Sequence, residues 1–153
     1  MLRAIRIEPS GHWPRDQAQD SVTLDHDARY RRRARLATDR GVAFLLDLPH
    51  AMAMGEGDGL ALEDGSWIAV RAKAEPLIEV TGPAALLCRI AWHIGNRHVP
   101  AAIEPQRILI RDDHVLADML RLQGASLRRV CEPFAPERGA YESHDHHVHH
   151  HDH

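Results

Sequence analysis

Apolar and polar side chains alternate through much of the first half of the chain, as they do in strands with one buried face. Residues 2–7 show this alternation clearly. The segments 38–41 and 64–65 contain Asp and Gly between apolar runs and are typical of hairpin turns. Pro49 lacks an N–H donor and is expected to end the strand before it. Strands are predicted at residues 2–7, 21–24, 30–38, 42–48, 60–62 and 67–72, forming a small all-β domain over residues 1–73.

The pattern changes to a mixture of helical and strand periodicity after residue 73. Pro83 is expected to open a helix, and Gly95-Asn96, which tolerate left-handed conformations, are expected to end it. Asp112 or Asp113 is expected to cap a second helix that Gly124 ends. The predicted buried faces are Leu86, Leu87, Ile90, Ala91 and Ile94, then Val115, Leu116, Met119 and Leu120. Strands are predicted at residues 77–80, 101–104, 107–111 and 126–134. The order is β-α-β-β-α-β, so the fold is α+β, with a ferredoxin-like domain over residues 74–141.

Histidine is concentrated at the end of the chain. Of the 13 histidines, seven lie in the last ten residues: His144, His146, His147, His149, His150, His151 and His153. Neutral imidazole is a good ligand for nickel, zinc and copper. Residues 142–153 cannot form a core and are expected to be disordered without metal. A purification tag is the alternative, but Asp and Val residues interrupt the run and make this origin less favoured.

Three further histidines in the second half are candidate ligands. His98 follows the expected end of the first helix, so it is predicted to be exposed, and a two-fold axis could place a second copy beside it. His114 lies in the first turn of the second helix, and His93 lies one turn before the end of the first. A solvent-exposed polar role is the alternative for both. An enzyme assembled from these three would lack an obvious general base, and no catalytic motif is present, so no catalytic residue is assigned.

Charge and composition argue against several other classes of protein. The net charge of −3 does not suggest a nucleic-acid-binding protein. The arginine-rich run at residues 30–35 is interpreted as a solvated sheet face, with a protein-docking surface as the next possibility. Cys88 and Cys131 lack a CxxC spacing and are interpreted as reduced thiols in the core. Without a signal-peptide pattern or a membrane-spanning apolar segment, we expect a soluble cytoplasmic protein that does not associate with membranes.

Three segments of the second half resemble a known family in the same order. These are Trp92-His93-Ile94-Gly95-Asn96-Arg97-His98-Val99-Pro100, residues 113–120, and residues 133–141 leading into the histidine tail. They are similar to the urease accessory nickel chaperones of the UreE family. The first half resembles the same family more loosely, through residues 46–49, 57–60 and 67–72.

The resemblance implies a fold, a metal and partners. It implies an N-terminal β domain that contacts partner proteins and a C-terminal domain that forms a homodimer. His98 would be the central nickel ligand at the dimer interface, and the tail histidines would add capacity. Nickel would pass through an accessory GTPase to urease apoprotein. Some members carry an extra histidine at the position of Asp112, so the matching auxiliary pair with His114 is incomplete here.

A nickel metallochaperone for urease is therefore the predicted function, with Ni²⁺ as its metal. Zn²⁺ or Cu²⁺ would also bind in vitro, because histidine sites accept both. The main alternative is a histidine-rich storage or buffer protein without a dedicated client. A metal-dependent hydrolase is the least favoured alternative, because no fixed ligand triad and base are evident.

Overall fold

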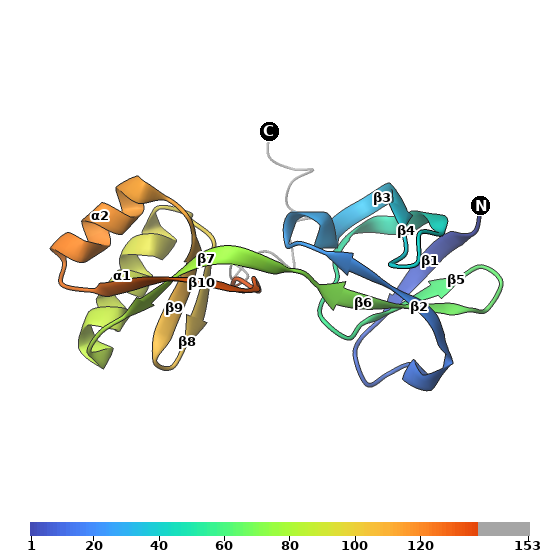
Figure 1. The fold of residues 1–153 in the computed structure, drawn as a ribbon, viewed down its shortest axis with the longest axis horizontal. Helices are drawn as coiled ribbons and strands as arrows, with labels where there is room; N and C mark the ends of the chain where they lie inside the picture. The colour runs from blue at the N-terminus through green and yellow to red at the C-terminus, as the bar shows by residue number, and fades with distance from the viewer. Residues whose placement is uncertain (138–153) are drawn as a thin grey trace. The chain divides into compact units, whose positions relative to one another are not determined.

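The structure is a computed structural model that describes residues 1–137, organised as two compact units (Figure 1). The first unit contains Met1–Pro76 together with Cys131–Phe134, and the second contains Leu77–Val130 and the described residues after Phe134. The polypeptide therefore returns to the first unit before it ends. The predicted histidine tail at residues 142–153 lies outside the described residues.

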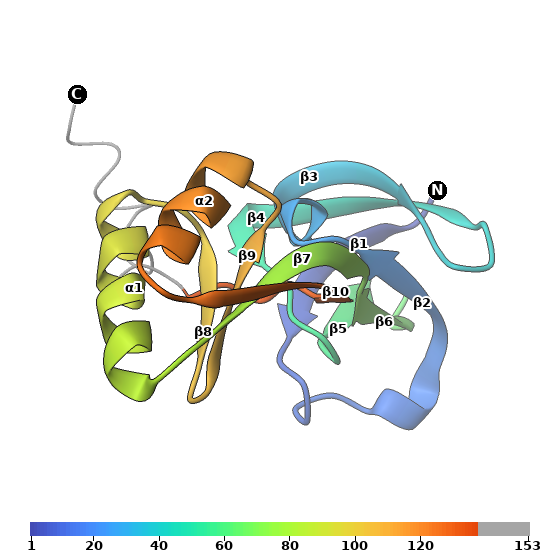
Figure 2. The ribbon, with the colours of Figure 1, turned by 60° about the vertical axis from the view of Figure 1, so that its left-hand side comes forward.

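The first unit is built on a six-stranded sheet with the order β2-β6-β5-β1-β4-β3. Its strands are β1 (Arg3–Glu8), β2 (Ala18–Leu24), β3 (Tyr30–Ala37), β4 (Ala43–Ala53), β5 (Gly59–Leu62) and β6 (Trp67–Ala72), and its two short 3₁₀ turns are η1 (Arg15–Gln17) and η2 (Asp27–Arg29). Figure 2 shows β3 following β4 along one border of this unit. The predicted all-β organisation of the first half is confirmed.

Strand β4 shows how the alternating pattern becomes a core. Phe44, Leu46 and Leu48 are buried at alternate positions, because successive side chains of a strand point to opposite faces. The prediction that Pro49 ends this strand is wrong, since β4 continues to Ala53. The register with β3 shifts at this point, so Pro49 lies in an irregular stretch where its missing N–H costs no ladder hydrogen bond.

Arg29 ties the C-terminal segment of the first unit to its interior. The residue is only 5% exposed, and its guanidinium donates hydrogen bonds to three main-chain carbonyls: Met54 O at 3.2 Å, Leu24 O at 3.0 Å and Phe134 O at 2.5 Å. Burial of the guanidinium lowers the pKa of Arg29 from its ordinary value. The Phe134 ring is fully buried and contacts His26 edge-on. Residues 131–134 are therefore an integral part of the first unit.

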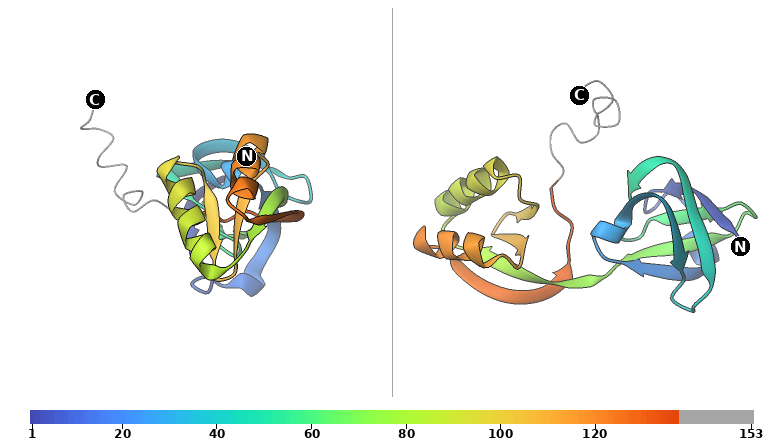
Figure 3. Two further views of the ribbon diagram at one scale, coloured as in Figure 1. Left: turned by 90° about the vertical axis from the view of Figure 1, so that its left-hand side faces the viewer. Right: turned by 90° about the horizontal axis from the view of Figure 1, so that it is seen from above.

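The second unit has the predicted ferredoxin-like order. Its sheet is arranged β10-β7-β9-β8, and the pairs β7–β9 and β8–β9 are antiparallel. Its elements are β7 (Ala74–Thr81), α1 (Ala84–Asn96), β8 (Ala101–Glu104), β9 (Arg107–Arg111), α2 (His114–Leu122) and β10 (Ser126–Pro133). Both helices cover the same face of the sheet (Figure 3). The α+β class predicted from the sequence is confirmed.

The core of the second unit forms between the helices and the sheet. Ile90 and Ile94 from α1 and Leu116 and Leu120 from α2 are buried in one cluster with strand residues of β7 and β9. The predicted burial of Val115 is wrong, since this side chain is 63% exposed. Helix α2 begins at His114, and its buried face consists of Leu116, Ala117 and Leu120.

The interpretation of the two cysteines as core thiols is also wrong. Cys88 lies on the outer side of α1 and Cys131 on β10, and both are exposed and unpaired with each other. Within the described residues, no helix is both long and apolar enough to cross a bilayer.

Candidate metal-binding site

His98 is the second residue after α1, and its backbone conformation is unusual. Its φ angle is +58°, and it is the one residue other than glycine with positive φ in the part of the chain that the structure describes. The side chain is exposed. Residues with a Cβ rarely adopt this left-handed conformation, because the Cβ approaches the following carbonyl oxygen. The backbone around His98 must therefore hold it there.

The hydrogen bonds at the end of α1 supply that constraint. The N–H of Val99 donates to Ile94 O at 3.3 Å, and the N–H of His98 donates to Gly95 O at 3.1 Å. This pair of bonds defines a Schellman motif, in which the residue just before the outer donor is left-handed. Val99 also packs against the core cluster that contains Ile94, as the motif requires. The core contact of Val99 thus fixes the backbone of His98, whose side chain is exposed.

Helix α2 ends in the same motif with the usual residue. Ala125 N–H donates to Leu120 O at 3.1 Å, Gly124 N–H donates to Arg121 O at 3.0 Å, and Gly124 has a φ angle of +101°. Gly124 thus occupies the position in α2 that His98 occupies in α1. Glycine adopts positive φ without a steric cost. The comparison within one chain shows that α1 carries a histidine where its fold would favour glycine.

The prediction that α1 ends at Gly95-Asn96 is confirmed, but the left-handed residue is not one of these two. The helix runs through Asn96, and neither residue has positive φ. The left-handed position is displaced to His98 because Val99, the next residue, is the one that packs on the core and bonds back to Ile94. The predicted exposure of His98 is confirmed.

His93 and Trp92 lie in the last two turns of α1. The two rings meet edge-on, with centroids 5.1 Å apart. His93 is half-buried, whereas Trp92 is 66% exposed. Trp92 therefore presents a large apolar ring to solvent. Trp92 and Cys88 are four residues apart in α1, so these two exposed side chains lie one turn apart on the same side of the helix.

His114 and Asp112 both line a shallow cavity of about 160 Å³ between α2 and β10. The carboxylate of Asp112 is already engaged, because Arg129 Nη1 lies 2.9 Å from Asp112 Oδ2. Three arginines also line this cavity: Arg121, Arg128 and Arg129. A cation that used Asp112 would have to displace the Arg129 guanidinium, and it would do so in a positively charged setting.

The structure does not bring the predicted ligands into one cluster within a single described chain. In residues 1–137, no three histidine, cysteine or carboxylate side chains converge as a metal site. His98 follows α1, while His114 and Asp112 border α2, and the seven tail histidines are outside the described residues. A single exposed imidazole supplies one nitrogen ligand to a metal ion. It needs further ligands to hold that ion firmly.

Both halves of the chain match models of one family. Residues 2–73 match the N-terminal domain of the UreE urease accessory protein, and residues 75–153 match its C-terminal domain. The chain belongs to the UreE urease accessory protein family. A relative from Rhodobacter capsulatus named urease accessory protein UreE is 51% identical and covers 97% of both chains. Relatives of the same name from Chelativorans sp. (strain BNC1) and Ruegeria pomeroyi are 54% and 53% identical over 88% of this chain and cover 87% and 88% of their own lengths.

Two features of this UreE chain were missed in the sequence. The exposure of Trp92 could have been predicted from the helical spacing, because Trp92 lies about 200° around the helix from the buried Ile90. The ion pair between Asp112 and Arg129 joins positions 17 residues apart, and no local pattern signals it. Membership of the UreE family places the chain among the accessory proteins of urease, and so gives it a role in urease maturation.

Proposed function

We propose that this UreE chain is a metallochaperone that binds Ni²⁺ as cargo and delivers it for assembly of the urease metallocentre. The observation that carries the proposal is the left-handed histidine at the end of α1. Residues in sparsely populated backbone conformations persist where function needs them. His98 has an exposed imidazole, a position that favours glycine, and no side-chain hydrogen bond within the described residues. A ligand role accounts for keeping histidine at that position.

The proposed site needs a second copy of the chain. One imidazole binds Ni²⁺ weakly, whereas an isologous interface near His98 would place two imidazoles on one ion. The exposed Trp92 and Cys88 on the outward side of α1 support a homodimer through the second unit, because exposed aromatic residues are enriched at interfaces. Two shared imidazoles, supplemented by histidines from residues 142–153, suit a carrier, which has to release its ion as well as hold it.

The tail histidines and the auxiliary residues have secondary roles in this proposal. The seven imidazoles His144, His146, His147, His149, His150, His151 and His153 raise capacity and supply further ligands to the ion held by His98. His114, Asp112 and His93 are weaker candidates, since Arg129 competes for the Asp112 carboxylate. Zn²⁺ and Cu²⁺ are expected to bind in vitro through the same imidazoles.

The proposed recipients are urease apoprotein and its accessory GTPase, and the proposed place of action is the cytoplasm. The chain itself is proposed to perform no catalysis and to bind neither nucleic acid nor membranes. The alternative is a storage protein in which the tail supplies all binding. We expect His98→Ala to abolish the tightest Ni²⁺ site in calorimetric titrations and to reduce urease activation in cells. A tightest site that is unchanged in His98→Ala, but lost when residues 142–153 are removed, would establish the storage alternative.

A further inference from the structure

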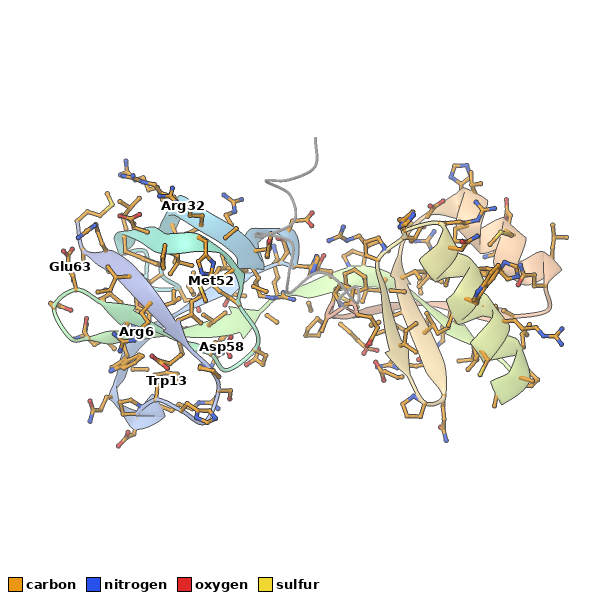
Figure 4. The ribbon with its side chains drawn as sticks, turned by 180° about the vertical axis from the view of Figure 1, so that it is seen from behind. Arg6, Trp13, Arg32, Met52, Asp58 and Glu63 are labelled. Atoms are coloured by element: carbon orange, nitrogen blue, oxygen red, sulfur yellow. The ribbon has the colours of Figure 1, made fainter. Side chains whose placement is uncertain are left out.

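Half of the eight residues of β3 are arginines, and all four side chains are exposed. We call this group the β3 arginines, and it consists of Arg31, Arg32, Arg33 and Arg35. Strand β3 lies at one end of the six-stranded sheet. Figure 4 shows Arg32 at the periphery of the first unit, beside the ribbon of β3. The overall charge of the chain is −3, so this strand has a local charge opposite to that of the whole chain.

The β3 arginines lack the partners that three other arginines of the first unit have. Arg3 pairs with Asp47 at 2.9 Å, Arg6 pairs with Glu8 at 2.6 Å, and Arg29 is bonded to carbonyls. Among the described residues, no hydrogen bond or ion pair engages the side chains of the β3 arginines. Their positive charge is therefore available to a binding partner.

Asp47, the carboxylate that lies opposite β3 in the register with β4, illustrates why a β3 arginine remains unpaired. Asp47 on β4 lies directly opposite Arg33 on β3. Its Oδ2 atom instead accepts a hydrogen bond from Arg3 Nη1, which reaches it from β1. Arg33 is thus next to an acidic residue whose charge is already compensated.

The backbone of β3 is also available along one side. In the sheet of the first unit, β3 pairs with β4 and has no strand on its other side. An edge strand presents unpaired N–H and C=O groups that can pair with another extended segment. The arginines discourage pairing with a second copy of β3, because like charges facing each other destabilise a sheet. An acidic strand would instead be attracted to the same edge.

We propose that the β3 edge is a docking site for an extended acidic segment of a partner protein. The segment adds a strand beside β3 by main-chain hydrogen bonds, and its carboxylates at alternate positions face Arg31, Arg33 and Arg35. Side chains two residues apart in a strand lie on the same face, so an alternating acidic segment matches their spacing. A single-stranded nucleic acid fits less well, since such sites combine charge with several stacking rings and Tyr30 is the one aromatic residue of β3. This docking site does not depend on nickel delivery.

The test uses the full chain and a fluorescein-labelled peptide in which Glu and Val alternate. Fluorescence anisotropy at low salt is expected to show binding that weakens about tenfold in Arg31→Ser/Arg33→Ser/Arg35→Ser, since each lost charge pair in a strand contributes a fraction of a factor of ten. The matched control Arg15→Ser/Arg71→Ser/Lys73→Ser removes the same charge from exposed positions elsewhere in the first unit and is expected to bind as wild type does. Added salt should weaken binding, because the pairs are exposed.

Three further peptides distinguish the contribution of charge from that of main-chain pairing, and they test whether β3 attracts negative charge. A Gln-Val peptide should not bind, and an acidic peptide interrupted by proline should bind weakly, because proline cannot donate to the ladder. The variant Arg31→Glu/Arg33→Glu/Arg35→Glu should no longer bind the Glu-Val peptide and should instead bind a Lys-Val peptide. Binding of the Lys-Val peptide would also demonstrate that the variant is folded. The proposal is overturned if wild type does not bind the Glu-Val peptide, if the control variant weakens it equally, if the proline-containing peptide binds as tightly, or if an oligothymidylate of equal length binds more tightly.

Discussion

Substitutions of His98, the left-handed residue beyond α1, can separate backbone strain from metal binding. His98→Gly and His98→Ala both remove the imidazole, but only glycine accepts a φ of +58° without steric cost. We therefore expect His98→Gly to be the more stable of the two variants, although both lose the proposed Ni²⁺ ligand. Because the imidazole is exposed and has no hydrogen bond in the described residues, its loss should itself change stability little.

The size of the difference follows from two opposing terms. A left-handed conformation costs a residue with a Cβ about 1–2 kcal/mol. Glycine loses more freedom on folding, which offsets about 0.5–1 kcal/mol of that gain. His98→Gly should therefore exceed His98→Ala in free energy of unfolding by about 0.5–1 kcal/mol. With a urea dependence of about 2 kcal/mol per molar, the midpoints should differ by about 0.3–0.5 M.

Urea unfolding followed by circular dichroism measures these midpoints, and calorimetric titration measures Ni²⁺ binding by the same samples. Gly124→Ala provides the converse control, since it introduces a Cβ at the equivalent position of α2, where φ is +101°. It should lower the midpoint without changing Ni²⁺ binding. Equal stability of His98→Gly and His98→Ala, or greater stability of the alanine variant, would refute the claim that this position is strained. Retention of the tightest Ni²⁺ site in both would refute the role of the imidazole.

Further predictions concern the interior, the pH response and the proposed dimer. Arg29→Met should destabilise the chain by about 2–4 kcal/mol in urea unfolding, because three buried carbonyls lose a charged donor. The hydrogen bond from Arg107 holds the pKa of Glu79 below its ordinary 4.5. The ionised Glu79 side chain therefore contributes fully to the free energy of unfolding above pH 4.5, and this contribution is lost as the pH falls through the lower pKa of the folded state. Glu79→Gln should therefore be less stable than wild type at pH 7, and the gap should close in unfolding experiments near pH 3. Ni²⁺ affinity should fall steeply between about pH 7.5 and about pH 6, since free imidazole titrates near 6.5, and flat calorimetric affinities would indicate carboxylate ligands. Trp92→Ser should shift sedimentation toward the monomer, and an unchanged profile would exclude α1 from the interface.

Long periodic segments were sufficient to predict the order of elements in both units. Ile90 and Ile94 on α1 lie at helical spacing and are buried as expected, and the alternating strand Phe44–Leu48 is likewise buried on one face. These predictions succeed because burial of one face fixes the period of the apolar residues. Boundaries were less predictable, since the end of β4 depends on a register shift against β3 that no local pattern encodes.

The candidate site was predictable in part. His98 could be selected from its position after a helix and from the family resemblance, and the structure places it there in the exposed state. Its left-handed conformation could not be predicted, because it depends on which later residue packs on the core, and that residue is Val99. Pairing of Asp112 with Arg129 was equally hidden, since it depends on the approach of β10 to the start of α2. The histidine tail lies outside the described residues, so its predicted role stays a prediction.

The return of residues 131–134 to the first unit has a consequence for biosynthesis. Proteins emerge from the ribosome N-terminus first, and N-terminal domains ordinarily fold while later segments are still being made. Here Arg29 is synthesised early, but one of its three carbonyl acceptors belongs to Phe134, 105 residues later. The first unit can therefore complete its interior only after residues 77–130, which belong to the second unit, have been translated. A nascent chain that stops short of Phe134 leaves a buried guanidinium incompletely bonded, so the fold of the first unit cannot be completed before Phe134 has been made.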